Sequence, residues 1–465
     1  MSQTVPAVLK TYQDCEQFLY QRTNFERTTP EVKKAHDLKL DRMRLILAQL
    51  GDPHLAIPIL HVAGTKGKGS TCQIAASILQ QTGKRIGLFT SPHIHRFEER
   101  MTVNVEMMSP DDMIALLNEF ITRVSASTED LLSSATFFEI TTALAWLHFV
   151  RQNVDYAVFE VGLGGRLDCT NLCRPVVTAI TRIGRDHVKV LGEEISQIAW
   201  EKAGIIKPGV PVINAANSVE AREVVHQVAI ERGSPEWELG SDIRIEVAEF
   251  WTEAKPMAKF TVRTPYHQFD KLELSVCGAH QIDNAATAVS MISQLMHADS
   301  RVVLSNDQIR QAVVESRLPM RIEKVSLKPM IILDVAHNGP SAEALVRTLK
   351  GLSVKRTYLL VACSKDKEIA EILQPLAGYF DEITVTRYLE NPRAAQPSDL
   401  AEILKTLETT ASVAENDVPQ AALEDLIAKA GPDDLICISG SFFLAAEMRG
   451  YLARRRAGGV NPLSS

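Results

Sequence analysis

The sequence predicts an α/β fold with two domains, a larger one built on a mostly parallel β-sheet and a smaller one after it. Short, wholly apolar segments alternate along the chain with segments of helical periodicity, which is typical of parallel sheets covered by helices. The chain has 465 residues, too many for one hydrophobic core. The alternation resumes after residues 316–319, so we expect domains of residues 1–317 and 318–465.

Composition narrows the class of protein. The chain is 45% hydrophobic and 23% charged with a net charge of −7, which is ordinary for a globular protein and leaves no basic surface for nucleic acid. No segment approaches the length of a membrane span, and the first ten residues lack the pattern of a signal peptide. The seven cysteines are scattered without a C-x-x-C pair, as expected for reduced thiols. We therefore expect a cytoplasmic protein that binds neither nucleic acid nor a membrane.

The first third of the chain shows the alternation most clearly. Residues 1–58 are expected to be helical and to end at the turn of residues 51–53. A buried strand is predicted over residues 59–63, followed by a glycine-rich loop and a helix from Thr71. Further strands are predicted over residues 85–89 and 101–104, and two helices within residues 110–150.

The rest of the chain continues this pattern, with one exception. Strands are predicted over residues 156–161 and 176–181, and helices from residue 196 and over residues 281–296. The exception is residues 240–277, where polar and apolar residues alternate as in an antiparallel sheet with one solvated face. Beyond the boundary, four more strands are predicted, over residues 330–333, 358–361, 383–386 and 435–439. The arginine-rich tail, residues 454–459, is expected to be disordered.

The glycine-rich loop has the composition of a phosphate-binding loop. Its sequence is GTKGKGS, residues 64–70, between a predicted strand and a predicted helix. Glycines let backbone N–H groups turn inward, and the helix N-terminus adds further donors for a polyphosphate. The spacing differs from the Walker pattern G-x-x-x-x-G-K-S/T, because Val62 stands five residues before Gly67 and Gly69 separates Lys68 from Ser70.

Two readings of this loop can be compared. An ordinary glycine-rich surface turn is disfavoured because two lysines lie among three glycines directly after an apolar run. In the other reading Lys68 reaches the distal phosphates of a nucleotide, while Ser70 or Thr71 faces Mg²⁺. The sequence therefore predicts a P-loop-type nucleotide site.

Polar residues follow three other predicted strands of the same sheet. Ser91, Glu160 and His187 come at or after the ends of strands, where ligands of open parallel sheets bind. With phosphate oxygens they would suit Mg²⁺, although histidine is not a preferred ligand of that ion. His187 could equally be a loop residue, and Ser91 before Pro92 a turn residue. Glu160 is the most informative, because a carboxylate ending so apolar a strand is costly unless a cation meets it.

Several further segments resemble one protein family. They are GTKGKGST, TSPHI with ERM, FEVGLGGRLDCTN, RDHVKVLG, AWEKAGIIKPG, GAHQIDNAATA, RIE, DVAHN and SGSFFLAAEMR. In this order they resemble folylpolyglutamate synthase/dihydrofolate synthase, the folate branch of the Mur ligase superfamily, over residues 38–448. The resemblance implies a P-loop-type domain like the central domain of Mur ligases, followed by a smaller Rossmann-like domain that closes over the nucleotide.

The resemblance also implies roles for single residues. The residues implied to hold ATP are Lys66, Gly67, Lys68, Gly69, Ser70, Asn284, Arg321, Asp334 and His337. The implied Mg²⁺ ligands are Ser91, Glu160, His187 and Lys202, the last as a carbamylated lysine. The implied pterin-binding residues are Thr136, Phe137, Phe138, Glu139, Leu167, Asp168 and Cys169. The implied catalytic residues are Lys68, Glu160, His187, Lys202 and Arg321.

Simpler explanations exist for some of these residues. Lys202 could be an ordinary surface lysine, and Asn284 a residue of the first helical turn. Adjacent residues point to different faces of a helix, so only one of Phe137 and Phe138 is expected to meet a ligand. The chain also departs from the family pattern: Lys66 replaces a usual asparagine, Met320 a usual glycine and Cys169 a usual small residue.

The implied reaction is an ATP-dependent ligation. ATP would phosphorylate a substrate carboxylate, and the amine of L-glutamate would attack the acyl phosphate and release phosphate. The implied partners are small molecules, dihydropteroate or a reduced folate with L-glutamate, and the protein is expected to be a monomer. One alternative is a Mur-type ligase of UDP-muramoyl peptides, disfavoured by the GLGGRLD segment and the lack of a further N-terminal domain. Another is a P-loop regulatory NTPase.

Overall fold

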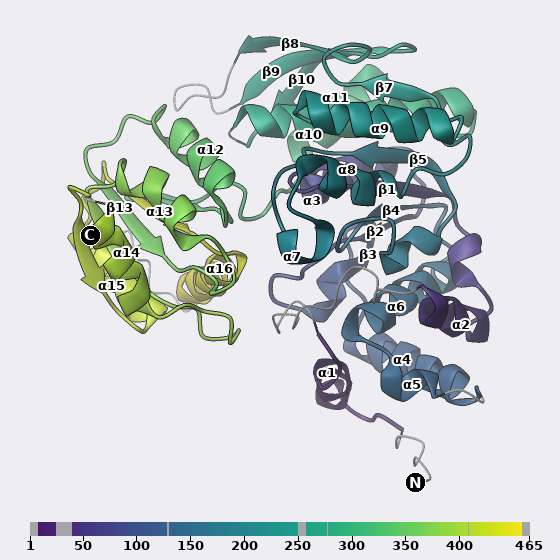
Figure 1. Cartoon of the computed structure of the whole chain (residues 1–465), viewed down its shortest axis with the longest axis horizontal. Coiled ribbons are helices and arrows are strands. Elements are labelled where there is room, and N and C mark those ends of the chain that lie inside the picture. Colours follow the sequence, from purple (N-terminus) through teal and green to yellow (C-terminus); the bar gives the residue numbers. More distant parts are fainter. Residues whose placement is uncertain are drawn as a thin grey trace.

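The computed structural model describes residues 8–24, 40–127, 130–249, 257–276, 278–407 and 409–457. Figure 1 shows two bodies side by side, a larger one coloured purple to teal and a smaller one coloured green to yellow. Each body contains a β-sheet with helices on both faces. The predicted α/β class is confirmed.

The larger body is organised around a seven-stranded sheet of order β3-β2-β4-β1-β5-β6-β7. Its strands are β1 (Ile59–Ala63), β2 (Ile86–Phe89), β3 (Met101–Val103), β4 (Tyr156–Glu160), β5 (Pro175–Ile180), β6 (Val212–Asn214) and β7 (Glu236–Glu238). Only β3 runs antiparallel to its neighbour. The carboxyl ends of β1, β2, β4 and β5 therefore meet at one edge, as predicted from the order of the loops.

Alternate residues of the central strand β1 face two different helical layers. Leu60 and Val62 pack under α3 (Lys68–Gln80) and α10 (Ala279–Ala298). Ile59 and Ala63 face the opposite side, where helices of two clusters cover the sheet. These helices are α1 (Tyr12–Tyr20), α2 (Asp41–Gln49), α4 (Pro110–Ser125), α6 (Phe137–Arg151), α8 (Ile195–Ala203) and α9 (Val219–Glu231).

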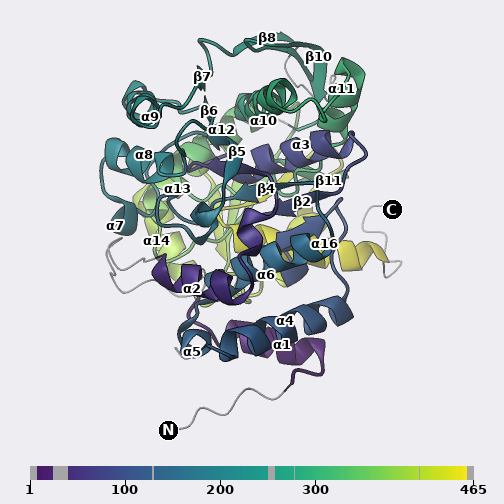
Figure 2. The same ribbon diagram turned by 90° about the vertical axis from the view of Figure 1, so that its right-hand side faces the viewer.

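The predicted antiparallel flank is present. Strands β8 (Arg244–Glu249), β9 (Ala258–Arg263) and β10 (Gln268–Leu274) form a three-stranded sheet in the order β10-β9-β8. The inward residues of β9 and β10 join the hydrophobic cluster under α10. Helix α11 (Asn306–Glu315) packs beside them, and Figure 2 shows this layer above the main sheet.

The smaller body contains a six-stranded sheet of order β11-β12-β16-β13-β14-β15, in which only β11 is antiparallel to its neighbour. Its strands are β11 (Glu323–Leu327), β12 (Met330–Leu333), β13 (Thr357–Val361), β14 (Glu382–Val385), β15 (Ser412–Glu415) and β16 (Leu435–Ser439). Helices α12 (Gly339–Leu349), α13 (Ile369–Ala377) and α14 (Pro397–Thr406) pack on one face, and α15 (Pro419–Lys429) and α16 (Phe442–Ala457) on the other.

The structure corrects several predicted elements. The arginines of the predicted disordered tail extend α16, and Arg455 forms an ion pair of 2.9 Å with Glu424 of α15. Helix α3 begins at Lys68, three residues earlier than predicted, and a one-turn helix α5 (Leu131–Ser134) lies between α4 and α6. Of the predicted N-terminal helical region, residues 1–7 and 25–39 lie outside the described residues, as do residues 458–465 of the tail. In the described part of the chain, no helix is long and apolar enough to cross a bilayer.

Candidate active site

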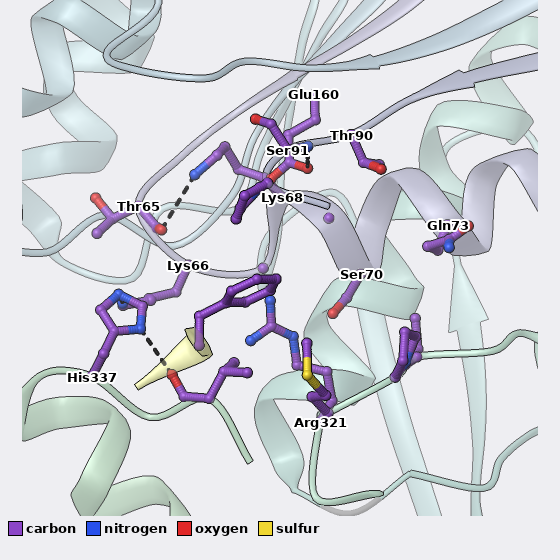
Figure 3. A pocket seen from close by; sticks show the side chains of 18 of the residues that line it. Thr65, Lys66, Lys68, Ser70, Gln73, Thr90, Ser91, Glu160, Arg321 and His337 are labelled. Carbon is purple, nitrogen blue, oxygen red and sulfur yellow. Dashed lines mark hydrogen bonds between the residues drawn. The ribbon is translucent and has the colours of Figure 1, made fainter. Parts of the chain in front are cut away.

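A cleft of about 2180 Å³ lies between the two bodies, next to the carboxyl ends of the parallel strands. Every site residue predicted from the sequence lines it, with the exception of Thr71, Phe137 and Lys202, so of the two candidate hydroxyls only Ser70 reaches the cleft. Figure 3 shows the phosphate-binding loop and Glu160 on one side of the cleft, with Arg321 and His337 on the other. The structure thus brings together residues that are up to 271 positions apart in the sequence, such as Lys66 and His337.

The loop between β1 and α3 is shaped by a close approach at Gly67. This glycine is the N-cap of α3 with a φ of 95°, and the helix has no side-chain cap. A Cβ atom at Gly67 would lie 2.1 Å from Oδ1 of Asn284. Asn284 is 3% exposed and donates from Nδ2 to Gln281 Oε1 over 3.0 Å. Asn284 thus packs directly against the loop. Because α3 has no side-chain cap, its first backbone N–H groups remain available to a ligand in the cleft.

Glu160 and Lys68 form the charged centre of this edge. Glu160 is 6% exposed, and its carboxylate accepts a bond of 3.1 Å from the backbone N–H of Ser91. Burial raises the pKa of Glu160, while Lys68, the Ser91 N–H and Arg321 oppose this rise. The buried carboxylate at the end of an apolar strand therefore does meet cations, as the sequence led us to expect.

The predicted metal ligands differ in their surroundings. Ser91 and Glu160 lie together, and their oxygen atoms suit Mg²⁺. His187 is instead half exposed, has a left-handed φ of 52°, and contacts Asp186 at 3.9 Å. No group of three or more histidine, cysteine or acidic side chains in the described ranges is placed to hold a metal. Ser91 and Glu160 are thus adjacent, whereas His187 is half exposed beside Asp186, and the Mg²⁺-binding role of these residues stays a prediction.

Lys202 is not a surface lysine. It lies on α8, is 4% exposed, and donates from Nζ to the carbonyl of Gly64 over 2.9 Å. Burial, assisted by Lys68, lowers the pKa of Lys202 to about 7. The preceding Glu201 pairs with Arg166 at 2.7 Å. A buried amine therefore sits directly behind the start of the phosphate-binding loop.

Arg321 is carried by a strained loop of the smaller body. Its neighbours Met320 and Ile322 both have left-handed backbones, with φ of 55° and 52°. Asp334 accepts bonds from the N–H groups of Ile322, at 3.0 Å, and Ala336, at 2.8 Å. Burial raises the pKa of Asp334 to about 6, an effect that Arg321 opposes. Asp334 thus holds the loop that points Arg321 into the cleft.

The sequence did not predict a cluster around Asp186 that joins the two bodies. Asp186 contacts Lys367 Nζ at 2.7 Å, Lys66 Nζ at 3.9 Å and His337 Nε2 at 3.8 Å. His337 donates from Nδ1 to Val335 O over 2.8 Å, so its Nε2 accepts the bond of 2.6 Å from Lys66. Asp186 could have been noted because it follows a strand end, but nothing in the sequence pairs it with Lys367.

The predicted pterin-binding residues divide into two groups. Phe138 lines the cleft and packs on Gly162, where a Cβ atom would lie 2.4 Å from the phenyl Cζ. Phe137 is 1% exposed and stacks on Tyr20 with 5.8 Å between ring centres. The prediction for Phe137 is therefore corrected: it is a core residue, because adjacent helical positions face different sides.

Thr136 and Glu139 cap α6 rather than standing free in the cleft. The Thr136 N–H and hydroxyl both donate to Glu139 Oε2 over 2.8 Å, and Thr136 Oγ1 accepts from the Glu139 N–H at 3.3 Å. Arg42, which the sequence reasoning missed, donates from Nε to both carboxylate oxygens of Glu139 at 2.9 Å. Together these residues form a preorganised polar wall of the cleft.

The loop after β4 supplies the opposite wall, with Leu167, Asp168 and Cys169. Asp168 is 5% exposed and accepts bonds from the N–H groups of Leu163, at 2.9 Å, and Thr170, at 3.0 Å. Burial raises the pKa of the Cys169 thiol well above its ordinary value, so Cys169 is a neutral packing residue at neutral pH.

Comparisons with known proteins agree with this geometry. The model of the Mur ligase middle domain matches residues 62–292, and that of the Mur ligase glutamate ligase domain matches residues 320–442. The dihydrofolate synthase/folylpolyglutamate synthase of Bacillus subtilis (strain 168) is 33% identical over 441 residues, 94% of this chain and 98% of the relative. The protein of the same name from Escherichia coli (strain K12) is 31% identical over 427 residues, covering 92% of this chain and 94% of the relative.

Solved structures show the same likeness. The folylpolyglutamate synthase of Thermotoga maritima superposes with a TM-score of 0.80 at 31% identity, covering 97% of this chain and 98% of the other. E. coli FolC in complex with DHPP and ADP superposes with a TM-score of 0.82 at 28% identity, covering 97% of this chain and all of the other.

The close approach at Gly67 gives a prediction. Gly67→Ala should lower the free energy of unfolding by about 2–4 kcal/mol, because the methyl group adds a clash with Asn284 to left-handed strain. Gly83→Ala is the matched control, since Gly83 has a φ of 74° but no atom within 4 Å of its Cβ position, and should cost about 1 kcal/mol. Urea unfolding measures both; equal losses in the two variants would contradict the importance of the Asn284 contact.

Proposed function

The chain belongs to the folylpolyglutamate synthase/dihydrofolate synthase family of Mur ligases, and on this basis we propose how its cleft carries out ligation. The protein is an ATP-dependent ligase that adds L-glutamate to a folate-type carboxylate. The substrate is the carboxylate of dihydropteroate, the γ-carboxylate of a reduced folate, or both. The observation that carries the proposal is the meeting of the phosphate-binding loop, Glu160 and Arg321 in one cleft.

In the first step, the substrate carboxylate attacks the γ-phosphorus of ATP, forming an acyl phosphate and ADP. The chain contributes positioning and charge rather than a nucleophile. The open N–H groups of α3 and the ammonium of Lys68 hold the phosphates from one side. Arg321 faces them from the smaller body, held in place by Asp334.

In the second step, the neutral amine of L-glutamate attacks the acyl carbon, and the carbon–oxygen bond to phosphate breaks. The amine loses its proton, and phosphate leaves. Water must be kept from the acyl phosphate, and a cleft covered by both bodies serves that purpose. The cluster of Lys66, His337, Asp186 and Lys367 joins the two bodies beside the loop.

Mg²⁺ would neutralise charge on the transferred phosphoryl group. Glu160 and Ser91 are the residues placed to hold it. We propose the same role for His187 after a change of its loop, and for Lys202 once it carries a carbamate. Carbamylation joins the neutral amine of Lys202 to CO₂ and releases one proton, which leaves an anionic oxygen ligand. A pKa of about 7 makes the neutral amine available at physiological pH.

The pterin ring is proposed to bind between Phe138 and the loop of Leu167, Asp168 and Cys169, with Thr136 and Glu139 at its edge. Asn284 and the loop of Asp334 are proposed to border the adenosine part of ATP. We also propose that residues 1–317 and 318–465 are separate domains, that the protein is a monomer, and that it works in the cytoplasm.

The test of this function is ADP release with a panel of acceptors. Wild-type protein should release ADP with dihydropteroate or tetrahydrofolate only when L-glutamate is present. Its turnover number should lie within the usual enzyme range of about 1–10³ per second. ADP release with a UDP-muramoyl peptide instead would identify a Mur-type cell-wall ligase. ADP release that no acceptor stimulates would identify a regulatory NTPase.

Glu160→Gln should separate activity from stability. Losing the negative charge should lower kcat about 100-fold or more at saturating Mg²⁺. The free energy of unfolding should stay equal or rise, because a neutral amide is cheaper to bury than a carboxylate whose pKa burial raises. The control is Glu98→Gln, a buried carboxylate bonded to Tyr12 at 3.0 Å outside the cleft, which should lose stability and keep kcat. Near-normal turnover of folded Glu160→Gln would rule out the metal-binding role.

Lys202→Ala should be nearly inactive, and short carboxylic acids such as acetate should partly restore kcat by filling the position of the carbamate oxygens. Carbamylation should increase as pH rises through 7, because only the neutral amine reacts with CO₂. The control is Lys207→Ala. Lys207 also donates to a backbone carbonyl, that of Asn171, over 2.7 Å. Acetate should not raise the kcat of this variant. A ¹³C signal of a carbamate after incubation with ¹³CO₂ checks the modification. An unmodified amine in active, metal-loaded enzyme would contradict it.

A further inference from the structure

A chain of buried hydrogen bonds runs behind the cleft and ends at Asp168. His61 lies in the middle of β1 and is completely buried. Its Nδ1 is 3.6 Å from Cys173 Sγ, and its Nε2 is 2.9 Å from Thr170 Oγ1. The Thr170 hydroxyl donates to Asp168 Oδ1 over 2.6 Å. The chain thus connects the core of the sheet to a carboxylate that lines the cleft.

The direction of each bond follows from the number of protons. The hydroxyl of Thr170 has a single proton, which it donates to Asp168, so toward His61 it must accept. His61 therefore carries its proton on Nε2 and leaves Nδ1 to accept from the thiol of Cys173. Burial, assisted by Lys207, lowers the pKa of His61 to about 3, in keeping with a neutral ring.

The bonds leave Asp168 with little freedom. An ionised carboxylate offers about four acceptor positions. Oδ1 accepts from both the N–H and the hydroxyl of Thr170, and Oδ2 accepts from the N–H of Leu163. The orientation of the carboxylate is therefore fixed by three hydrogen bonds out of about four acceptor positions, with the N–H of Gly162 also near enough to favour its charged form, and the side chain lines the cleft.

We propose that His61 and Thr170 are positioning residues that orient the Asp168 carboxylate as an acceptor for an N–H group of the pterin substrate. This inference rests on the proposed function, in which Asp168 borders the pterin. His61 itself does not line the cleft, so it acts only through Thr170. A buried imidazole and hydroxyl are costly within an apolar sheet face, and the bond network to Asp168 accounts for their presence.

The geometry also separates this role from that of ATP binding. Asp168 and Thr170 belong to the loop after β4, whereas the phosphate-binding loop follows β1. His61 lies within β1, three residues before Gly64, which begins the phosphate-binding loop, and its bonds run to the loop after β4. Loss of the bond chain should therefore weaken binding of the pterin substrate more than that of ATP or glutamate.

The test is steady-state kinetics of the full-length protein with ATP, L-glutamate and dihydropteroate. Thr170→Val removes the hydroxyl at nearly constant volume and should raise KM for dihydropteroate about tenfold, with KM for ATP and glutamate within twofold. Thr170→Ser restores the hydroxyl and should return KM for dihydropteroate to within about threefold of wild type. Cys173→Ala leaves the bonds from His61 to Asp168 intact and should not change this KM.

His61→Leu is the second variant, because Thr170→Val leaves the N–H of His61 buried without a partner and can fail to fold. In His61→Leu the bond from Thr170 to Asp168 persists, so KM for dihydropteroate should rise by a smaller factor of about three. An unchanged KM for dihydropteroate in both variants, or an equal rise for all three substrates, would overturn the positioning role. Wild-type protein that releases no ADP with dihydropteroate and glutamate would instead overturn the proposed function.

Discussion

Clustered positive charge at the carboxyl edge of the large sheet is the constraint on which the rest of the site depends. Lys68 and Lys202 come from the larger body, and Arg321 comes from the smaller one. Their nearby carboxylates, Glu160 and Asp334, have pKa values raised by burial, so neither is an ideal counter-ion. The triphosphate of ATP would supply the negative charge that these cations need. Its negative charge would be balanced by these cations, and the cleft is therefore complementary to ATP before any ligand arrives.

The contact between the two bodies has the same polar character around the phosphate-binding loop, although Ile94 of the larger body also packs on a small apolar cluster with Met320 and Val335 of the smaller one. Lys66 donates to His337 across the cleft, and Asp186 pairs with Lys367. Charged and polar contacts of this kind can exchange partners with phosphate and water, whereas a large apolar interface would resist opening. Lys66 stands where the family usually has a neutral residue, so in this chain the phosphate-binding loop itself reaches the smaller body. An interface of this kind can open to admit substrates and can close again over them.

Sequence reasoning succeeded where local pattern determines position. The strands ending near Ala63, Phe89, Glu160 and Ile180 are apolar and parallel, so their loops had to meet at one edge. Strands β6 and β7 were missed because three residues show no periodicity. The resemblance could place both phenylalanines near the pterin, but only packing on Tyr20 decides that Phe137 is the buried one.

Contacts between residues far apart in the sequence could not be predicted, for a different reason. Asp186 and Lys367 lie in loops that follow strands of two separate sheets, and no local sequence pattern indicates which loop of one body faces which loop of the other. Arg42 and Glu139 are likewise far apart, and Glu139 was assigned to the pterin pocket with no cation beside it. The arginines at the end of α16 resembled a solvated tail because their partner, Glu424, lies on another helix.

The loop after β4 shows why the nucleotide and pterin sides of the cleft are built as one unit. A Cβ atom at Gly165 would lie 2.8 Å from the carbonyl oxygen of Lys202, so the loop rests directly on the backbone of α8. On its other side Lys202 donates to Gly64, the first residue of the phosphate-binding loop. Helix α8 is thus held between the two loops, and Lys202 contacts both through different atoms. A carbamate on its Nζ would keep one N–H for the bond to Gly64 and add two oxygen atoms on the phosphate side, while leaving the backbone contact with Gly165 unchanged. Modification of Lys202 would then act on the phosphate side of the cleft without moving the wall that faces the pterin.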